Sequence, residues 1–349
     1  MRSISFIVPS WHYYADPLKH QPYWELYYAT QLKNNGFIVD IIDLRLTKKN
    51  SLKEAIEDIP EKTFYFYWIF KTGDAKELYA TANLLKKKFP NSIHAAGGTH
   101  VDKCPDECKK YFDSIVVGPG EQSFAKIIED AEKNVLMKEY SENYKSVPFS
   151  NTTFPDRSFL PKESIVNNKL FDQYGDIKGT LTYFSRGCMF KCAFCTYNVP
   201  SYLQIKSPEL IKKEIAYLKN NYGIEGLLVK DEVAISPNKK VSAAVSDAIG
   251  ESEIVWRGQT TTQATYDQLK MAKESGCLEL AIGVETVDEG VMKIINKSWQ
   301  SENSVKEFIY NSKKLNIKVK ICFILGLPGE PRNILEKTIK FLEENEPDY

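Results

Sequence analysis

The 349-residue chain has no net charge, no long apolar run and no histidine after residue 100. Lys and Arg together number 46, as do Asp and Glu, so no broad electrostatic attraction to nucleic acid or anionic lipid is expected. No apolar run reaches membrane-spanning length, and the N-terminus lacks the small-residue cleavage site of a signal peptide. The sequence therefore predicts a cytoplasmic protein with neither a nucleic-acid nor a membrane partner.

Seven cysteines in such a chain indicate metal or redox chemistry more than a disulfide framework. Cys188, Cys192 and Cys195 have the spacing C-x3-C-x2-C. A structural zinc site needs four ligands, usually as two pairs, but the next cysteine is Cys277 and no histidine lies nearby. Three ordinary core thiols rarely cluster in this way. A cubane iron–sulfur cluster fits better, because one short loop can hold three irons and leave the fourth open to a substrate or cofactor.

The first half of the chain alternates buried strands with helices, which predicts a doubly wound, Rossmann-like (flavodoxin-like) parallel sheet. The expected strands are 3–9, 37–44, 63–70, 92–98 and 112–118, and the expected helices are 22–36, 74–90 and 121–133. The aromatic run at 63–70 is interpreted as a core strand. We expect this domain to span residues 1–135, followed by a polar, proline-containing surface linker over 136–178.

The second half, 179–349, alternates again and predicts a partial β/α barrel, in which chemistry is carried at the carboxyl ends of the strands. The expected strands are 180–185, 225–233, 253–261, 278–286 and 318–328. Between the first two, Ser207 can cap a helix that begins at Pro208 and ends at Gly223. The three cysteines follow the first of these strands directly.

The segment SRGCMFKCAFC resembles the signature of the radical S-adenosylmethionine (radical SAM) family, C-x3-C-x-(aromatic)-C, with Phe194 as the aromatic residue. The resemblance implies a [4Fe-4S] cluster on Cys188, Cys192 and Cys195. It also implies that the open iron binds the amino and carboxylate groups of SAM, and that one electron cleaves SAM to a 5′-deoxyadenosyl radical that takes a hydrogen atom from the substrate.

The resemblance continues along the later strands. GCLELAIGVET is similar to the fourth-strand segment, with Glu285 facing SAM, and ILGLPGE to the fifth, with Ile324 and Gly326 against adenine. Asp231, Glu232 and Arg257 are polar groups that could meet the amino, ribose or carboxylate groups of SAM. A solvated strand end is the alternative for each of them. The final PDY resembles the start of a sixth barrel strand, so the barrel is expected to lack its last strand.

The order of the two domains resembles the cobalamin-binding-domain subgroup, which includes the anaerobic magnesium-protoporphyrin IX monomethyl ester cyclases. AGGTHVDKCPDE, VVGPGEQSF and FPDRSFL also match that subgroup. Of the cobalamin motif D-x-H-x-x-G only His12 is in register, and Gly97 and Gly98 could let the backbone approach a ligand. Two outcomes stay open: the domain binds cobalamin, with or without His12, or it has kept the fold and lost the ligand.

The leading interpretation is a radical SAM enzyme, with a cobalamin-dependent methyltransferase or cyclase as one form. The alternatives are a cobalamin-free radical SAM enzyme and a non-catalytic iron–sulfur or ligand-sensing protein. A low-potential flavodoxin or ferredoxin is the expected electron donor, and the substrate is expected to be a small molecule. His100 is interpreted as a surface hydrogen-bonding residue, and Cys104 and Cys108 as ordinary thiols.

Overall fold

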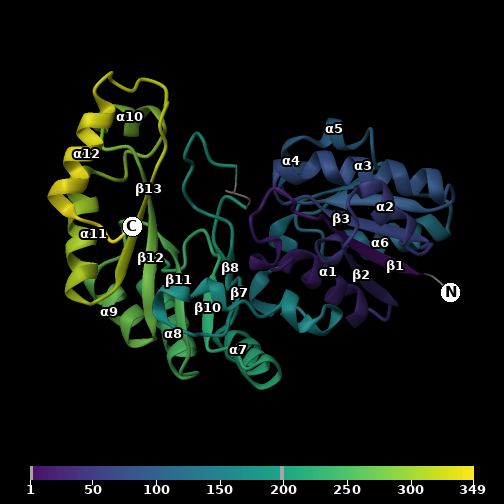
Figure 1. Ribbon diagram of the computed structural model, residues 1–349, viewed down its shortest axis with the longest axis horizontal. Helices are drawn as coiled ribbons and strands as arrows, with labels where there is room; N and C mark the ends of the chain where they lie inside the picture. The colour runs from purple at the N-terminus through teal and green to yellow at the C-terminus, as the bar shows by residue number, and fades with distance from the viewer. Residues whose placement is uncertain (1–2, 197–199) are drawn as a thin grey trace. The chain divides into compact units, whose positions relative to one another are not determined.

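The computed structural model describes residues 3–196 and 200–349, which divide into two compact units. Unit 1 comprises residues 1–148 and 152–167, and unit 2 comprises 149–151 and 168–349. Each unit has its own parallel sheet (Figure 1). No helix in the described part of the chain is long and apolar enough to cross a membrane.

Unit 1 is built on a six-stranded parallel sheet with the strand order β2-β1-β3-β4-β5-β6. Its strands are β1 (Ile4–Val8), β2 (Val39–Asp43), β3 (Phe64–Trp68), β4 (Ile93–Gly97), β5 (Ser114–Val117) and β6 (Glu139–Ser141). Its helices are α1 (Tyr23–Asn34), α2 (Leu52–Glu57), α3 (Thr72–Lys88), α4 (Thr99–Lys103), α5 (Pro105–Cys108) and α6 (Ser123–Glu132). The order 2-1-3-4-5 is that of flavodoxin-like folds, so the predicted fold class is confirmed for this unit.

Strand β3 shows why the sheet is covered on both faces. All five of its residues are buried, and successive side chains point to opposite faces. Phe66 packs against Phe124 of α6, with ring centroids 4.9 Å apart, whereas Tyr65 and Tyr67 join the core formed with α2 and α3. The aromatic run is therefore a core strand, as predicted.

The segment 136–178 is more structured than a surface linker. It contributes β6 to the first sheet, and a series of short 3-10 helices follows between Tyr144 and Tyr174. The buried guanidinium of Arg157 lies 5.4 Å from the centre of the Tyr23 ring in α1. The sequence analysis did not predict this strand, because its surroundings are polar and β6 has only three residues, of which one is buried.

Unit 2 contains a five-stranded parallel sheet with the order β13-β12-β11-β10-β7. The strands are β7 (Gly179–Thr182), β10 (Gly226–Val229), β11 (Val255–Thr260), β12 (Cys277–Glu285) and β13 (Lys318–Phe323), and a small antiparallel pair is formed by β8 (Ser185–Arg186) and β9 (Gln204–Ile205). The helices are α7 (Pro208–Tyr222), α8 (Lys239–Gly250), α9 (Tyr266–Glu274), α10 (Glu289–Ile294), α11 (Glu302–Lys314) and α12 (Ile334–Asn345). Figure 1 shows α7, α8, α9 and α11 along one side of this sheet.

Local signals place the elements of unit 2. The Ser207 side chain accepts a hydrogen bond from the Leu210 amide at the start of α7, and Gly223 ends the helix in the left-handed conformation, as predicted.

At the edge of the sheet formed by β13, the Tyr349 amide donates to the Val319 carbonyl and the Tyr349 carbonyl accepts from the Ile321 amide. The last residue thus begins to pair with β13 beyond the five strands of this partial barrel.

Candidate functional site

The three cysteines lie on a loop at the carboxyl edge of the second sheet. The loop follows Arg186 of β8, and the short antiparallel pair β8–β9 closes its base. Gly187 precedes Cys188 with φ +83°, and a Cβ there would collide with the carbonyl oxygens of Pro200 and Tyr202. The Cys188 amide donates to the Pro200 carbonyl at 3.1 Å. A glycine is therefore required for the chain to turn into the first cysteine.

The far side of this loop is held by the segment that follows α10. The Ala193 amide donates to the Ile295 carbonyl at 2.9 Å, and the Asn296 side-chain amide donates to the Lys191 carbonyl at 2.7 Å. The Phe190 ring stacks on the Trp299 ring with centroids 4.1 Å apart. These contacts fix the loop between Cys188 and Cys195 from outside the signature itself.

The three thiols are partly exposed and influence one another. Burial raises the pKa of Cys188 to about 11, and the neighbouring Cys195, Glu232 and Cys192 add to the increase. Burial also raises the pKa of Cys192, while the Lys297 ammonium opposes it. A bound metal displaces the protons of its thiol ligands. Three thiols this close together disfavour one another's charged form when free, and they are suited to binding a metal.

Glu285 lies at the end of β12, on the Cys192 side of the loop, and Lys297 holds it there. The Lys297 Nζ is 3.2 Å from the Glu285 Oε1 and also donates to the Gly283 carbonyl. Their side chains are only 4% and 12% exposed. A Cβ at Gly283 would collide with the Glu285 carboxylate, so the glycine makes room for this ion pair. The result is a buried, positioned carboxylate beside the thiols.

Asp231 and Glu232, after β10, have different environments. Asp231 is buried and accepts the Phe184 amide at 2.8 Å, so it holds the chain between β7 and β8. Burial raises its pKa to about 6. Glu232 lies near Cys188, and burial followed by the charge of Asp231 raises its pKa to about 8. Of the two, Glu232 is therefore the one whose charge acts on a cysteine of the loop.

Three of the remaining predicted SAM residues lie at the same edge. Phe194 lies between the second and third cysteines and its side chain is 38% exposed. Ile324 follows β13, packs against the cluster of Val291, Ile295 and Leu327, and donates its amide to the Glu285 carbonyl at 2.9 Å. Gly326 has φ +87° and donates its amide to the Glu330 carboxylate at 2.8 Å.

Arg257 is not brought to this edge. It is the third residue of β11, so about 10 Å of strand separates it from the carboxyl end at Thr260. Its Nη1 lies 3.6 Å from the Glu279 carboxylate, which also accepts from Gln173 and Tyr174. The structure therefore places Arg257 in a polar group deeper in the sheet, away from the cysteine loop.

In unit 1, the expected cobalamin residues follow β1 and β4. The His12 side chain is 74% exposed, and its Nδ1 lies 3.3 Å from the Glu77 Oε2 of α3. Glu77 also accepts the Ser10 amide at 2.7 Å. A Cβ at Gly97 would be 2.8 Å from the Trp68 ring, and one at Gly98 would be 2.7 Å from the Ile69 carbonyl oxygen. Packing against the end of β3 thus requires both glycines.

The sequence analysis missed Lys297, Trp299 and Glu77. Lys297 and Trp299 lie between two helices, where no strand end marks a site, and Glu77 lies inside α3. One local signal marks Glu77 in the sequence. It lies three residues after Asp74, in the first turns of a helix that follows a strand end.

Comparison with known proteins identifies relatives of this chain. Residues 182–342 match the family model described as the Radical SAM superfamily. An uncharacterised methyltransferase of Pyrococcus horikoshii is 26% identical over 295 residues, covering 80% of this chain and 63% of its own length. The anaerobic magnesium-protoporphyrin IX monomethyl ester cyclase of Cereibacter sphaeroides is 24% identical over 381 residues, covering 99% of this chain and 60% of its own length. The chain thus spans about three fifths of the length of these relatives.

Solved structures show the same fold over nearly the whole chain. The radical SAM methyltransferase TsrM from Kitasatospora setae, solved with tryptophan and a SAM analogue, superposes with a TM-score of 0.79 at 12% identity, covering 99% of this chain and 72% of that one. The cobalamin-dependent radical SAM enzyme OxsB, solved with aqua-cobalamin, gives 0.80 at 15% identity, covering 98% and 52%. The predicted architecture and the predicted relatives are confirmed.

Proposed function

Because residues 182–342 match the family model of the Radical SAM superfamily, we propose that Cys188, Cys192 and Cys195 bind three irons of a [4Fe-4S] cluster. The observation that carries this proposal is the cysteine loop, whose three partly exposed thiols are fixed from both sides at the carboxyl edge of the sheet. Three thiolates without a fourth suit a cubane with one open iron. When cluster and SAM are bound, this cofactor pair supplies reductive cleavage of SAM and hydrogen-atom abstraction from the substrate.

The residues around the loop have the chemistry that SAM requires. The Glu285 carboxylate, held by Lys297, is placed to accept from an ammonium or hydroxyl group of SAM beside Cys192. The exposed Phe194 ring offers a flat apolar surface for adenine, and the Ile324 backbone is bonded to Glu285 at the same edge. Asp231 acts by orienting the chain before the loop, and Glu232 is the second acidic side chain next to the cluster.

The reaction class follows from the relatives, among which are methyltransferases and cyclases. We propose a methyl transfer or a ring-forming step on a small-molecule substrate, with a low-potential flavodoxin or ferredoxin as the electron donor and the cytoplasm as the compartment. The sulfonium of SAM is hard to reduce, which is why a low-potential donor is needed.

Chromatography of SAM products tests this function. Anaerobically reconstituted and reduced protein should release 5′-deoxyadenosine or, as a methyltransferase, S-adenosylhomocysteine as well. The Cys192→Ala variant is the matched control and should release neither. Intact SAM after long incubation with protein whose cluster is verified as reduced would contradict the enzyme and favour the sensor.

Cobalamin binding in unit 1 is the second proposal, and the His12–Glu77 pair favours it. A carboxylate that contacts one nitrogen of an exposed histidine orients the ring, as partners of metal-bound histidines do. Glu77 thus supplies from α3 what the missing aspartate of the motif would supply from the loop.

The test is the absorption spectrum of protein produced with cobalamin supplied. We expect a base-off/His-on spectrum that changes in His12→Ala and shifts less in Glu77→Gln. An unchanged spectrum in His12→Ala would remove the histidine from cobalt. Well-folded protein that takes up no cobalamin would favour the cobalamin-free enzyme.

A further inference from the structure

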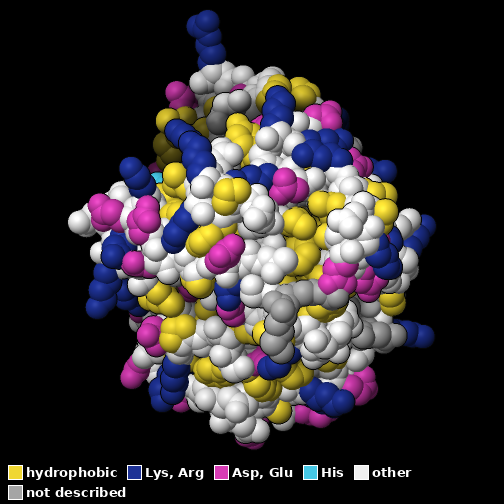
Figure 2. Space-filling view, turned by 90° about the vertical axis from the view of Figure 1, so that its right-hand side faces the viewer, with side chains coloured by type: hydrophobic (Ala, Val, Ile, Leu, Met, Phe, Trp, Pro, Cys, Tyr) yellow, Lys and Arg dark blue, Asp and Glu magenta, His cyan; other side chains and the backbone are white. Residues whose placement is uncertain are grey.

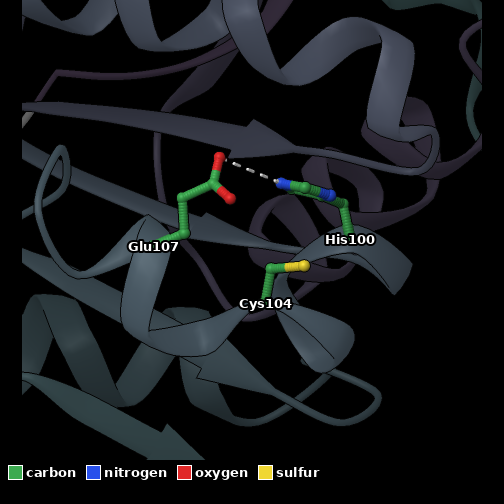
Figure 3. Close-up of side chains that lie close together, drawn as sticks. All are labelled: His100, Cys104 and Glu107. Carbon is green, nitrogen blue, oxygen red and sulfur yellow. Dashed lines mark ion pairs between the residues drawn. The ribbon is translucent and has the colours of Figure 1, made fainter.

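Unit 1 contains a second group of metal-binding side chains, separate from the cysteine loop. Figure 3 shows His100 of α4, Cys104 at the corner between α4 and α5, and Glu107 of α5 pointing toward one another. One ligand atom from each lies within 4.8 Å of the other two. The His100 Nε2 and the Glu107 Oε1 are 3.9 Å apart. An imidazole, a thiol and a carboxylate thus converge on one point.

The local backbone bends at this point. The Cys104 amide donates to the His100 carbonyl at 2.8 Å, which ends α4, and Cys104 itself is non-helical, with φ −131° and ψ 51°. The next helix, α5, begins at Pro105 and carries Glu107, so the three side chains come from two short helices and the corner between them. Two metal ligands at i and i+4 on a helix are a known zinc-binding arrangement. The sequence signal is H-x3-C-x2-E.

We propose that His100, Cys104 and Glu107 bind one divalent transition-metal ion, Zn²⁺ foremost, with water at the fourth position. Thiolate together with imidazole selects zinc over the hard cations Mg²⁺ and Ca²⁺. Tetrahedral zinc with bonds of about 2.0 to 2.3 Å places its ligand atoms roughly 3.5 Å apart. The 3.9 Å separation of His100 and Glu107 is close to that value, and the half-exposed Glu107 side chain can make the small adjustment.

The surroundings of His100 fit a ligand better than the surface histidine expected from the sequence. The residue is 4% exposed, and its Nδ1 lies 3.2 Å from the Thr72 Oγ1 of α3. A proton on Nδ1 that is donated to Thr72 leaves the Nε2 lone pair for the metal, which is the usual support of a metal-bound histidine.

Tyr79 is the competing partner of His100. Its hydroxyl is 2.9 Å from the His100 Nε2 and 3.3 Å from the Cys108 Sγ. Metal binding therefore requires this hydroxyl to give up Nε2 and keep its contact with Cys108, which is fully buried. Without a metal, the group is a hydrogen-bond network that joins α3 to α5. The metal-bound and metal-free states differ in whether the His100 Nε2 contacts the metal or the Tyr79 hydroxyl.

The site does not depend on the function proposed for unit 2, because none of its three residues belongs to that unit. A bound ion would join α4 to α5 just after the turn at Gly97 and Gly98, which connects β4 to α4. It would thus fix the helices that follow one of the strand ends of unit 1.

Cobalt(II) absorption tests the proposal, since cobalt replaces zinc and reports thiolate ligands by charge-transfer bands. The measurement uses the 349-residue chain carrying Cys188→Ser, Cys192→Ser and Cys195→Ser, which removes the competing thiols. We expect one Co²⁺ per chain with tetrahedral ligand-field bands and sulfur-to-cobalt charge transfer. Addition of Zn²⁺ should abolish both.

Variants separate the proposed ligands from other groups. Cys104→Ser should remove the charge-transfer band, and Glu107→Gln, at a half-exposed position that should not affect folding, should lower Co²⁺ affinity at least tenfold. Cys322→Ser, at an exposed cysteine of unit 2, is the matched control and should change nothing. No stoichiometric binding to the folded chain, or a charge-transfer band that survives Cys104→Ser, would overturn the proposal.

Discussion

Both units contain a parallel sheet, but the loops at the carboxyl ends of the strands are very different. In unit 2 this edge gathers three thiols, two carboxylates and a lysine, and hydrogen bonds from distant segments fix them. In unit 1 the loop after β1 carries the aromatic residues Trp11, Tyr13 and Tyr14, and its His12 imidazole is largely exposed. A strand end positions whatever its loop carries, so fold alone predicts a binding site and the loop chemistry decides which one.

A second contrast lies in what holds the loops. The cysteine loop of unit 2 is bound through backbone groups, such as those of Ala193 and Ile295, and also through the side chains of Asn296 and Trp299. The loop after β1 is held by side chains of α3, with Tyr13 bonded to Asp74 and the Ser10 amide bonded to Glu77. Backbone contacts persist through most substitutions, whereas side-chain contacts do not. Unit 2 is therefore the better-specified site, and the following predictions test that difference.

The largest effect is expected at the three cysteines. Cys188→Ala, Cys192→Ala or Cys195→Ala should abolish the cluster, which in the native protein should contain about four irons per chain. Iron and sulfide analysis, together with the absorption at about 400 nm, measures the cluster content. Cys104→Ala and Cys108→Ala in unit 1 are the matched controls and should retain the iron. Loss of the cluster in Cys104→Ala would show that the ligand assignment is wrong.

A smaller but substantial effect is expected at the ion pair beside the cluster. Lys297→Met leaves the buried Glu285 carboxylate without its partner and should lower the free energy of unfolding by about 3 kcal/mol. SAM affinity should fall as well, because Glu285 loses its fixed position. Chemical denaturation and SAM titration measure the two effects.

Gly283→Ala separates position from charge at the same pair. The new Cβ displaces the end of the Glu285 side chain and comes within 3.3 Å of the Lys297 Nζ, so both charges stay but the carboxylate moves. The loss of stability should be smaller than in Lys297→Met, because neither charged group is removed, and SAM affinity should still fall. Unchanged SAM affinity in both variants would exclude Glu285 from the SAM site.

A moderate effect is expected at Phe194. Phe194→Ala should weaken SAM binding by about 1–2 kcal/mol, the scale of a lost ring contact and its buried area, and should leave the iron content intact. Equilibrium binding of SAM to the reconstituted protein measures it, and Phe194→Tyr, which keeps the ring, is the control. If both variants bind SAM like the native protein, adenine lies elsewhere.

The smallest effect is expected at Arg257. Arg257→Gln removes a partly exposed ion pair with Glu279, which keeps its hydrogen bonds from Gln173 and Tyr174. The cost in stability should be about 1 kcal/mol or less, and SAM affinity should not change. A large loss of SAM affinity would contradict the placement of Arg257 away from the cysteine loop.

These residues show how far the sequence could lead. Caps and apolar runs are local signals, so α7 and the main strands were predictable, as was the edge at which the cysteines lie. The partners that position them come from distant segments: Trp299 stacks on Phe190, and Glu77 reaches the loop of His12. Only the folded chain shows such pairs.

Arg257 was predicted only as a polar group of the third strand that could meet SAM. Its strand was predicted correctly, but the sequence does not show how deep in the sheet Arg257 lies or which side chain it meets. The partner Glu279 lies at the matching position of the next strand, through the register of a parallel pair. Strand pairing sets the register of a strand and the depth of each residue in the sheet. The sequence analysis treats each strand alone, so it cannot predict either of them.

The most direct test of the account concerns the open iron of unit 2. Electron–nuclear double resonance on the reduced native protein, with SAM labelled by ¹⁵N in its amino group, detects whether that nitrogen binds the cluster. The account predicts a resolved ¹⁵N hyperfine coupling that is absent without SAM. The coupled signal should be weaker in Gly283→Ala, because that variant binds less SAM. A cluster of four irons whose signal shows no coupling to the labelled nitrogen would contradict it.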